Sequence, residues 1–270
     1  MSIATPPAAY EAILARDGTL RFRRSAVMLT IVVLIVIAMA LTGLLDPKRF
    51  SEAWPAIKQL SSEMFPPDFR RFHAWIRPLA DTLAMSVAGT ALAVTISLPL
   101  ALFAARNTTP NQIVYRASRA SLNLLRSIPE LIMGIIFVAM VGFGALPGVL
   151  AVGLHSVGMV GKFFAESIEH ADPKPIEAAR ATGASPLQVV FHAILPQVLP
   201  QLADTTIYRW EYNFRASTVL GAVGAGGIGF ELIAALRVLE YAQVSAILIC
   251  ILICVTMVDG IGAVLRNHLK

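Results

Sequence analysis

Residues 131–161 read LIMGIIFVAMVGFGALPGVLAVGLHSVGMVG, a run of 31 residues without a formal charge. Gly142, Gly144, Pro147 and Gly148 interrupt this run near its middle. A bilayer core of about 30 Å needs about 20 helical residues per span, so the run is too long for one crossing. It suits two spans joined by a tight Gly/Pro turn. Because the run does not alternate with a period of two, it is not a lipid-exposed β-strand.

The rest of the chain extends this pattern. Hydrophobic residues make up 56% of the sequence and charged residues only 14%, whereas soluble domains carry roughly 25% charged residues. Spanning segments must satisfy their own backbone hydrogen bonds, which favours helices. We therefore predict an all-α integral membrane protein of about six transmembrane helices. The predicted spans are roughly 26–45, 79–105, 124–143, 146–168, 197–221 and 241–263.

The first apolar run also resembles a cleaved signal peptide. Basic residues precede it, and Ala38-Met39-Ala40 imitates a small-residue cleavage site. A core of 20 uncharged residues is long for a signal peptide, so an uncleaved first helix is favoured.

The basic residues predict the orientation. If six spans place both termini on one side, that side holds eleven lysines and arginines and the other side seven. The excess favours cytoplasmic termini in a bacterial inner membrane. The net charge of +5 is scattered over span ends without interleaved aromatic residues, so nucleic acid is not an expected partner.

The sequence offers no metal site and no disulfide. Cys250 and Cys254 lie four residues apart on one face of an apolar run, which makes a bond between them implausible. No C-x-x-C or H-E-x-x-H spacing occurs, and no nucleophile–base pattern suggests an enzyme.

A polar segment between the fourth and fifth spans carries the most informative motif. Residues 177–183 read EAARATG, and Leu195-Pro196 begin twelve positions after Gly183. Glu177 to Ala181 are strong helix formers, Ala178 and Ala179 are small enough for close approach, and Gly183 lets the chain turn. The pattern resembles the cytoplasmic coupling loop of binding-protein-dependent ABC importer permeases. One departure is Ala193, where the family usually has isoleucine.

Further stretches resemble phosphonate importer permeases in particular. These are MFPPDF (64–69), RSIPE (126–130), YRWEYNFR (208–215) and GAVGAGGIG (221–229). The resemblance covers about residues 60–266, although the Gly-rich run alone is shared with methionine-type permeases. It implies a type I ABC importer permease fold with a cytoplasmic coupling helix. The apolar runs, the basic residues and the resemblance together predict a cytoplasmic segment 1–25, a first helix 26–45, a periplasmic segment 46–78 and a transmembrane domain 79–265 with the coupling loop at 169–196.

The resemblance also implies partners and site residues. The expected partners are an ABC ATPase dimer, a substrate-binding protein, a second permease copy that makes a homodimer, and the lipid bilayer. The coupling-loop residues are Glu177, Ala178, Ala179, Gly183, Leu195 and Pro196. ATP and Mg²⁺ belong to the ATPase subunit, because no G-x-x-x-x-G-K-[ST] motif occurs in this chain.

The fifth predicted span carries ionisable residues, which inside a membrane usually face an aqueous path or a bundle interior. Arg209 and Asn213 share one helix face, and Glu211 and Arg215 share another. Guanidinium groups bind phosphonate or phosphate oxygens bidentately, so these four residues are a candidate translocation path for a small oxyanion. The alternative is structural: Glu211 and Arg215 would neutralise one another. Arg126 and Glu130 form a second expected pair, and Lys162 and Glu166 a third.

The Gly-rich run 221–229 follows this span. It lacks the strand and the Lys-Ser/Thr that a phosphate-binding loop requires, so Gly224, Gly226, Gly227 and Gly229 are a candidate helix break and gate. The predicted function is the permease subunit of an ATP-driven importer for phosphonate- or phosphate-type oxyanions. The alternatives are an ABC permease for another small substrate such as methionine, or a secondary carrier that uses Asp204, Glu211 and Asp259 as ion sites.

Overall fold

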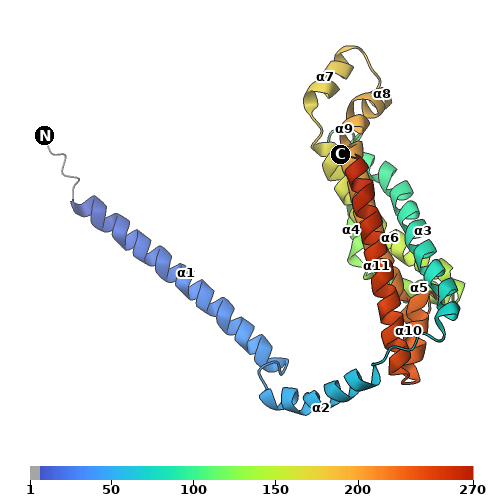
Figure 1. Cartoon of the computed structure of the whole chain (residues 1–270). Coiled ribbons are helices and arrows are strands. Elements are labelled where there is room, and N and C mark those ends of the chain that lie inside the picture. Colours follow the sequence, from blue (N-terminus) through green and yellow to red (C-terminus); the bar gives the residue numbers. More distant parts are fainter. Residues whose placement is uncertain (1–6, 270) are drawn as a thin grey trace. The chain divides into compact units, whose positions relative to one another are not determined.

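The computed structural model describes residues 7–269, and every regular element among them is a helix (Figure 1). The elements are α1 (Pro7–Leu41), α2 (Pro47–Glu63), α3 (Phe72–Ala104), α4 (Gln112–Ser127), α5 (Glu130–Val141), α6 (Ala145–Glu169), α7 (Pro173–Ala181), α8 (Pro186–Val189), the π-helix η1 (Val190–Ile194), α9 (Leu195–Leu220), the 3₁₀ turn η2 (Gly221–Val223), α10 (Ile228–Arg237) and α11 (Tyr241–Leu269). The chain divides into two compact units, residues 1–62 and 63–270, which we describe separately.

The first unit contains α1 and nearly all of α2. Residues 23–41 of α1 are long and apolar enough to span a membrane, and none of that stretch is buried by protein. The helix ends at Leu41, four residues before the predicted end of the first span. The helix α2 lies within the predicted polar segment and was not expected, because Pro55 and many polar side chains obscure its pattern.

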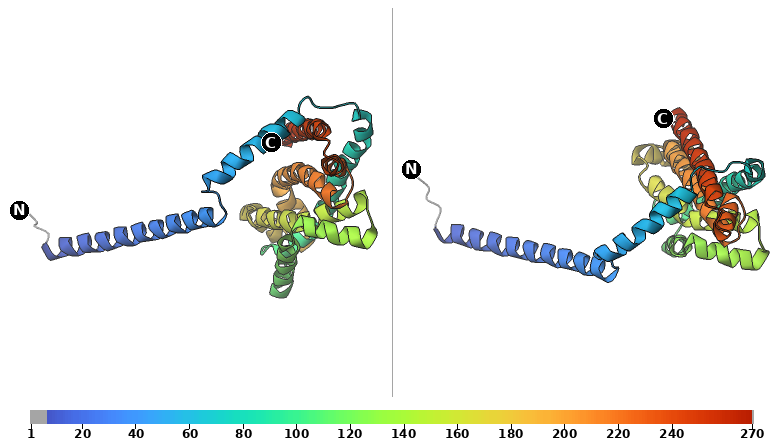
Figure 2. Two further views of the ribbon diagram at one scale, coloured as in Figure 1. Left: turned by 90° about the horizontal axis from the view of Figure 1, so that it is seen from below. Right: turned by 60° about the horizontal axis from the view of Figure 1, so that its bottom comes forward.

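The second unit is a bundle in which α6 packs along α3, and α9 packs against α3, α6 and α11. Figures 1 and 2 show that α7 and α8 stand at one end of this bundle, where α11 also ends, whereas α10 lies at the other end. We call these the α7 end and the α10 end. A core of small and aliphatic side chains, including Ala101, Val160 and Ile194, fills the α7 end. A second core around Trp75 and Ile247 fills the α10 end.

The number of candidate spans agrees with the expectation of about six, although two of them are bent. Four helical stretches can cross a membrane alone: 23–41, 72–104, 145–169 and 241–268. Two further candidates are helix pairs, one formed by α4 and α5 and the other running from α8 through α9 to α10.

The prediction of a continuous third span at 124–143 is wrong. The helices α4 and α5 meet at an angle of 86° around Ile128-Pro129. Pro129 has no N–H to continue a helix and pushes the preceding residue into extended backbone, which Ile128 adopts. With 12 residues, α5 alone is shorter than the roughly 20 residues of a spanning helix.

The turn predicted inside the run 131–161 is confirmed. α5 ends at Val141 and α6 begins at Ala145. Gly142 and Gly144 have φ angles of +86° and +130°, which side-chain-bearing residues rarely adopt.

The segment 64–71 lies near the start of the second unit and, as expected, is not helical. It is fixed to the start of α11, because the Ser245 hydroxyl donates to the Met64 carbonyl (2.6 Å) and the Asp68 N–H donates to the Ala242 carbonyl (2.9 Å). The Arg70 guanidinium donates to both oxygens of the Asp68 carboxylate, from Nε (3.0 Å to each) and from Nη2 (2.8 Å to Oδ2). These bonds lower the pKa of Asp68, so the pair stays ionised at neutral pH.

Candidate coupling helix and translocation path

The helix α7 holds the EAA motif, and its limits follow from local sequence. The Asp172 side chain accepts a hydrogen bond from the Lys174 N–H (3.0 Å), and Pro173 occupies the first helical position. At the other end the Gly183 N–H donates to the Arg180 carbonyl (3.0 Å) and the Ala184 N–H to the Ala179 carbonyl (3.3 Å). This is a Schellman motif, and Gly183 supplies its left-handed residue with φ +84°.

One face of α7 holds the helix on the bundle and the other is open. Ile176 is buried and Ala179 packs against the core of the α7 end. Glu177 and Ala178, in contrast, are exposed. The motif therefore presents a carboxylate and a small side chain to the outside.

A direct bond links the start of α7 to α9. The Asp172 N–H donates to the Gln197 side-chain oxygen (2.9 Å). Gln197 follows Leu195-Pro196, the second half of the predicted motif. Pro196 cannot donate a helical hydrogen bond, and the π-helix η1 immediately before it widens the turn there. A force on α7 therefore acts on α9 through a hydrogen bond and through the packed residues of η1.

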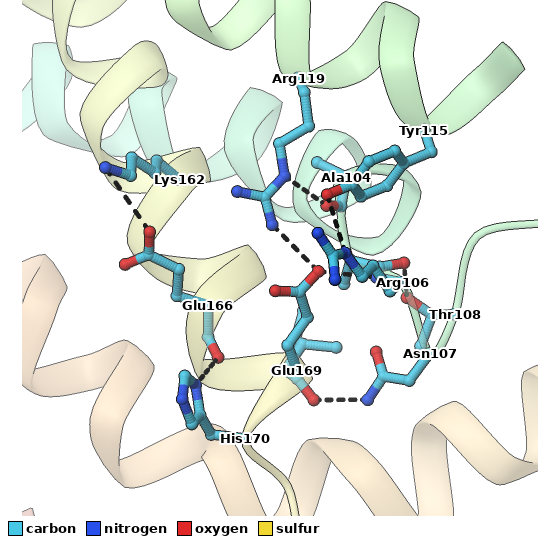
Figure 3. A network of polar contacts seen from close by, with 12 residues as sticks. Ala104, Arg106, Asn107, Thr108, Tyr115, Arg119, Lys162, Glu166, Glu169 and His170 are labelled. Carbon is cyan, nitrogen blue, oxygen red and sulfur yellow. Dashed lines mark hydrogen bonds and ion pairs between the residues drawn. The ribbon is translucent and has the colours of Figure 1, made fainter. Parts of the chain in front are cut away.

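A polar network that the sequence did not predict supports the same end of the bundle (Figure 3). Glu169, the last residue of α6, accepts from the Arg106 N–H (2.9 Å) and the Arg119 guanidinium (3.0 Å). Arg119 also donates to the Ala104 carbonyl (2.8 Å), and both arginines lie over the ring of Tyr115. The network joins the ends of α3 and α6 to α4. Glu169 lies 63 residues from Arg106 and 50 residues from Arg119 in the sequence, so no local spacing could reveal the network.

Arg209 lies in a buried polar chain that crosses three helices. Only 2% of Arg209 is exposed. Its Nε donates to the Ser156 hydroxyl (2.8 Å), Ser156 donates to Asn213 Oδ1 (2.9 Å), and Asn213 Nδ2 donates to the Thr90 hydroxyl (2.9 Å). The predicted shared face of Arg209 and Asn213 is therefore confirmed, with Ser156 of α6 bridging the two.

One of the three guanidinium nitrogens of Arg209, Nη2, forms no hydrogen bond within the described part of the chain. Its centre lies 4.3 Å from the ring of Tyr212, whose hydroxyl donates to Glu130 Oε1 of α5 (3.3 Å). Arg209 Nη2 and Glu130 Oε2 are buried without a hydrogen-bond partner among residues 7–269. A buried, charged N–H group without an acceptor is costly, which marks this position as a place where an anionic oxygen would be stabilised.

The expected pairing of Glu211 with Arg215 is wrong. Glu211 lies 2.8 Å from Arg266, and Arg215 lies 2.9 Å from Asp259. Both partners belong to α11, which packs against α9. Gly262 of α11 has no side chain, and this leaves room for the Glu211 carboxylate against α11. A Cβ at position 262 would collide with Glu211 Oε1. The charges of Glu211 and Arg215 therefore pair with charges on the antiparallel helix α11, and not with each other at the four-residue spacing within α9.

The other expected pairs differ in outcome. Lys162 and Glu166 form an ion pair at 3.6 Å, as predicted. Arg126 and Glu130 do not pair, because the bend between α4 and α5 separates them and Glu130 receives the Tyr212 hydroxyl instead.

The four candidate gate glycines lie where α9 gives way to α10. Gly224, Gly226 and Gly227 have φ angles of +99°, +74° and +71°, so the break requires glycine. The Gly144 N–H donates to the Gly224 carbonyl (3.2 Å), and the Ile228 N–H donates to the Thr82 hydroxyl (2.9 Å). The break thus connects α9 to the α5–α6 turn and to α3. At Gly229 a Cβ would overlap the Thr218 carbonyl.

Gly229→Ala is therefore expected to lower the thermal stability of the purified protein in detergent. Overpacking of this kind costs about 1–3 kcal/mol. The matched control is Gly260→Ala, since Gly260 lies in α11 with no atom within 4 Å of its Cβ position. The control should be neutral or stabilising by up to about 1 kcal/mol. Equal melting temperatures for Gly229→Ala and the unmodified protein would contradict the close approach of α9 and α10.

The bundle of apolar helices, with a small capped helix standing between two spans, is the architecture of an importer permease. The chain belongs to the family of binding-protein-dependent transport system inner membrane components, whose model matches residues 97–270. It is therefore a membrane-spanning permease of a bacterial ABC importer, and an inner-membrane component, as the sequence predicted.

Individual relatives of this chain are also permeases of transport systems. A phosphite transport system permease protein of Stutzerimonas stutzeri is 58% identical over 267 residues, which cover 99% of this chain and 97% of the relative. A phosphate-import permease protein of Mycolicibacterium smegmatis is 45% identical over 70% of this chain and 36% of its own length. A methionine ABC transporter in an inward-facing conformation is 25% identical, with a TM-score of 0.63 over 73% of this chain and 96% of the other.

Proposed function

We propose that the chain conducts phosphite, phosphonate or a similar phosphorus oxyanion across the inner membrane. The observation that carries this proposal is Arg209, a buried guanidinium of α9 whose Nη2 has no acceptor within residues 7–269. Guanidinium groups match the planar geometry of two phosphorus-bound oxygens. The phosphite and phosphate permeases that resemble this chain support the same class of substrate.

Coupling to ATP would occur at α7. Its exposed face would fit into a groove of an ABC ATPase subunit, and its buried face would pass the movement to α9. Glu177, Ala178 and Ala179 supply the contact and the anchor, Gly183 ends the helix, and Leu195 and Pro196 begin α9. ATP and Mg²⁺ would bind to the ATPase pair. The α7 end and both termini would therefore lie in the cytoplasm.

The complex would contain two permease chains and a binding protein at the α10 end. The family description names binding-protein-dependent transport, which supports the presence of that partner. A second copy of this chain would complete the path. The four glycines of the α9–α10 break would then form a gate at the side from which the substrate arrives.

The charge pairs speak against a secondary carrier. Glu211 and Asp259 would serve as ion sites in such a protein, yet each is paired with an arginine on the neighbouring helix. A guanidinium also binds carboxylates, so the preference for a phosphorus oxyanion over methionine rests on the similarity to the phosphite and phosphate permeases. The similarity to the methionine transporter is a similarity of fold.

Uptake of radiolabelled phosphite by cells with and without this gene tests the proposal. We expect gene-dependent uptake that persists when the proton gradient is collapsed, stops when ATP is depleted, and is competed by phosphonates but not by methionine. Uptake that is lost with the gradient would overturn the ATP-driven mechanism. Competition by methionine alone would overturn the substrate class.

A further inference from the structure

The helix α2 has one apolar face and no buried residue. Phe50, Trp54, Ile57 and Leu60 recur at spacings of three and four, and they are 40–66% exposed. At about 100° per residue, these side chains and Ala53 occupy roughly a third of the helix circumference. An apolar stripe of this kind, on a helix that is otherwise polar, requires a cover other than water.

The charges of α2 are ordered around this stripe. Arg49 and Lys58 flank its two edges, whereas Lys48 and Glu52 lie on the opposite side. Arg49 also lies 3.7 Å from the Asp46 carboxylate, in an ion pair that leaves 69% of the Arg49 side chain exposed. Long basic side chains at the edges of an apolar face can reach lipid phosphates while their stems stay in the apolar layer. Pro55, which leaves the Ser51 carbonyl without a helical donor, also lies on the polar side, where water can satisfy that carbonyl.

Short connections join both ends of α2 to helices that can span a membrane. The spanning stretch of α1 ends at Leu41, and only residues 42–46 separate it from α2. Five residues extend over at most roughly 17 Å. At the other end, Met64 follows the last residue of α2 directly and accepts the hydrogen bond from Ser245 in the first turns of the spanning helix α11. When the two helices cross a bilayer, these connections would keep α2 within reach of its surface.

We propose that α2 lies in the plane of the bilayer, with the stripe of Phe50, Ala53, Trp54, Ile57 and Leu60 inserted at the boundary between headgroups and acyl chains. Arg49 and Lys58 bind the phosphates of anionic phospholipids on either side. Trp54 has the amphipathic ring that is enriched at membrane interfaces. This surface is independent of the substrate and of the coupling helix.

Spin labels on single cysteines test the proposal in the full chain, reconstituted into vesicles of phosphatidylethanolamine and phosphatidylglycerol. Cys250 and Cys254 are first replaced by alanine. Cysteines at Ala53 and Ile57 then report on the apolar stripe, and cysteines at Glu52 and Gln59 serve as matched controls on the other face. The measured quantity is the ratio of collision rates with oxygen, which concentrates in lipid, and with a water-soluble nickel chelate.

We expect a several-fold higher oxygen-to-nickel ratio at positions 53 and 57 than at 52 and 59. Lys58→Glu should lower the ratio at position 57 by removing one phosphate contact. Equal access of the nickel chelate to all four positions would overturn the proposal. Protection of positions 53 and 57 from both reagents would also overturn it, because the stripe would then be covered by protein.

Discussion

Glu177→Ala is expected to reduce substrate uptake to the background of cells without the gene, whereas the amount of protein in the membrane stays unchanged. Glu177 is exposed on α7, and alanine is the strongest helix former, so the substitution should alter the free energy of unfolding by less than about 0.5 kcal/mol. A central interface residue contributes about 2 kcal/mol or more to binding, which is enough to uncouple the ATPase. Uptake and an immunoblot of the membrane fraction measure the two effects.

Glu52→Ala is the matched control for this variant. Glu52 is another exposed helical glutamate, but it lies on α2, far from the motif in sequence. Its replacement should leave uptake at the unmodified level. Normal uptake by Glu177→Ala would contradict the role of α7 as the coupling helix, and equal loss in both variants would point to a general sensitivity to surface charge.

Arg209→Met is expected to reduce uptake about 10- to 100-fold and to lower stability by about 1–3 kcal/mol. Methionine roughly keeps the volume of the side chain, but it leaves the buried Ser156 hydroxyl without the hydrogen bond that Arg209 donates. Losing a charge-assisted hydrogen bond to the passing anion costs about 1.5–3 kcal/mol, which corresponds to that loss in affinity. Initial uptake rates and melting temperature in detergent separate the two roles.

Arg215→Met provides the comparison for Arg209. Arg215 belongs to the same helix, but its charge is used by Asp259 and its side chain is 44% exposed. Its loss should affect the contact between α9 and α11 more than the affinity for the anion. A strong drop in melting temperature for Arg209→Met, with uptake per folded protein unchanged, would show that Arg209 is structural.

Much of the coupling region could be predicted because its signals are local. The helix α7 begins at an Asp-Pro pair and ends at a glycine, and both signals act within four residues. The turn at 142–144 and the glycine break at 224–227 were predictable for the same reason, since each needs backbone angles that only glycine adopts readily. Two local signals were underestimated: Pro129, which bends the third span by 86°, and the apolar stripe of α2.

The partners of the buried charges could not be predicted in this way. Within α9, the spacing of Glu211 and Arg215 suggests a pair, yet the nearest opposite charges come from α11. The bridge through Ser156 joins residues 53 and 57 positions apart, and Glu169 collects partners 50 and 63 positions away. Which charges meet depends on how the helices cross, and no short segment encodes that crossing.

The sequence by itself determined that this protein is a helical membrane protein of the importer permease family, and where its candidate coupling helix lies. Hydrophobic run length, proline, glycine and helix caps act over one or a few turns, so they can be read along the chain. The tertiary structure decided which donor of Arg209 is left unused and which helix neutralises Glu211 and Arg215. These properties depend on side chains that the fold brings together from distant helices. Leaving a charge unpaired is costly only where the bundle buries it.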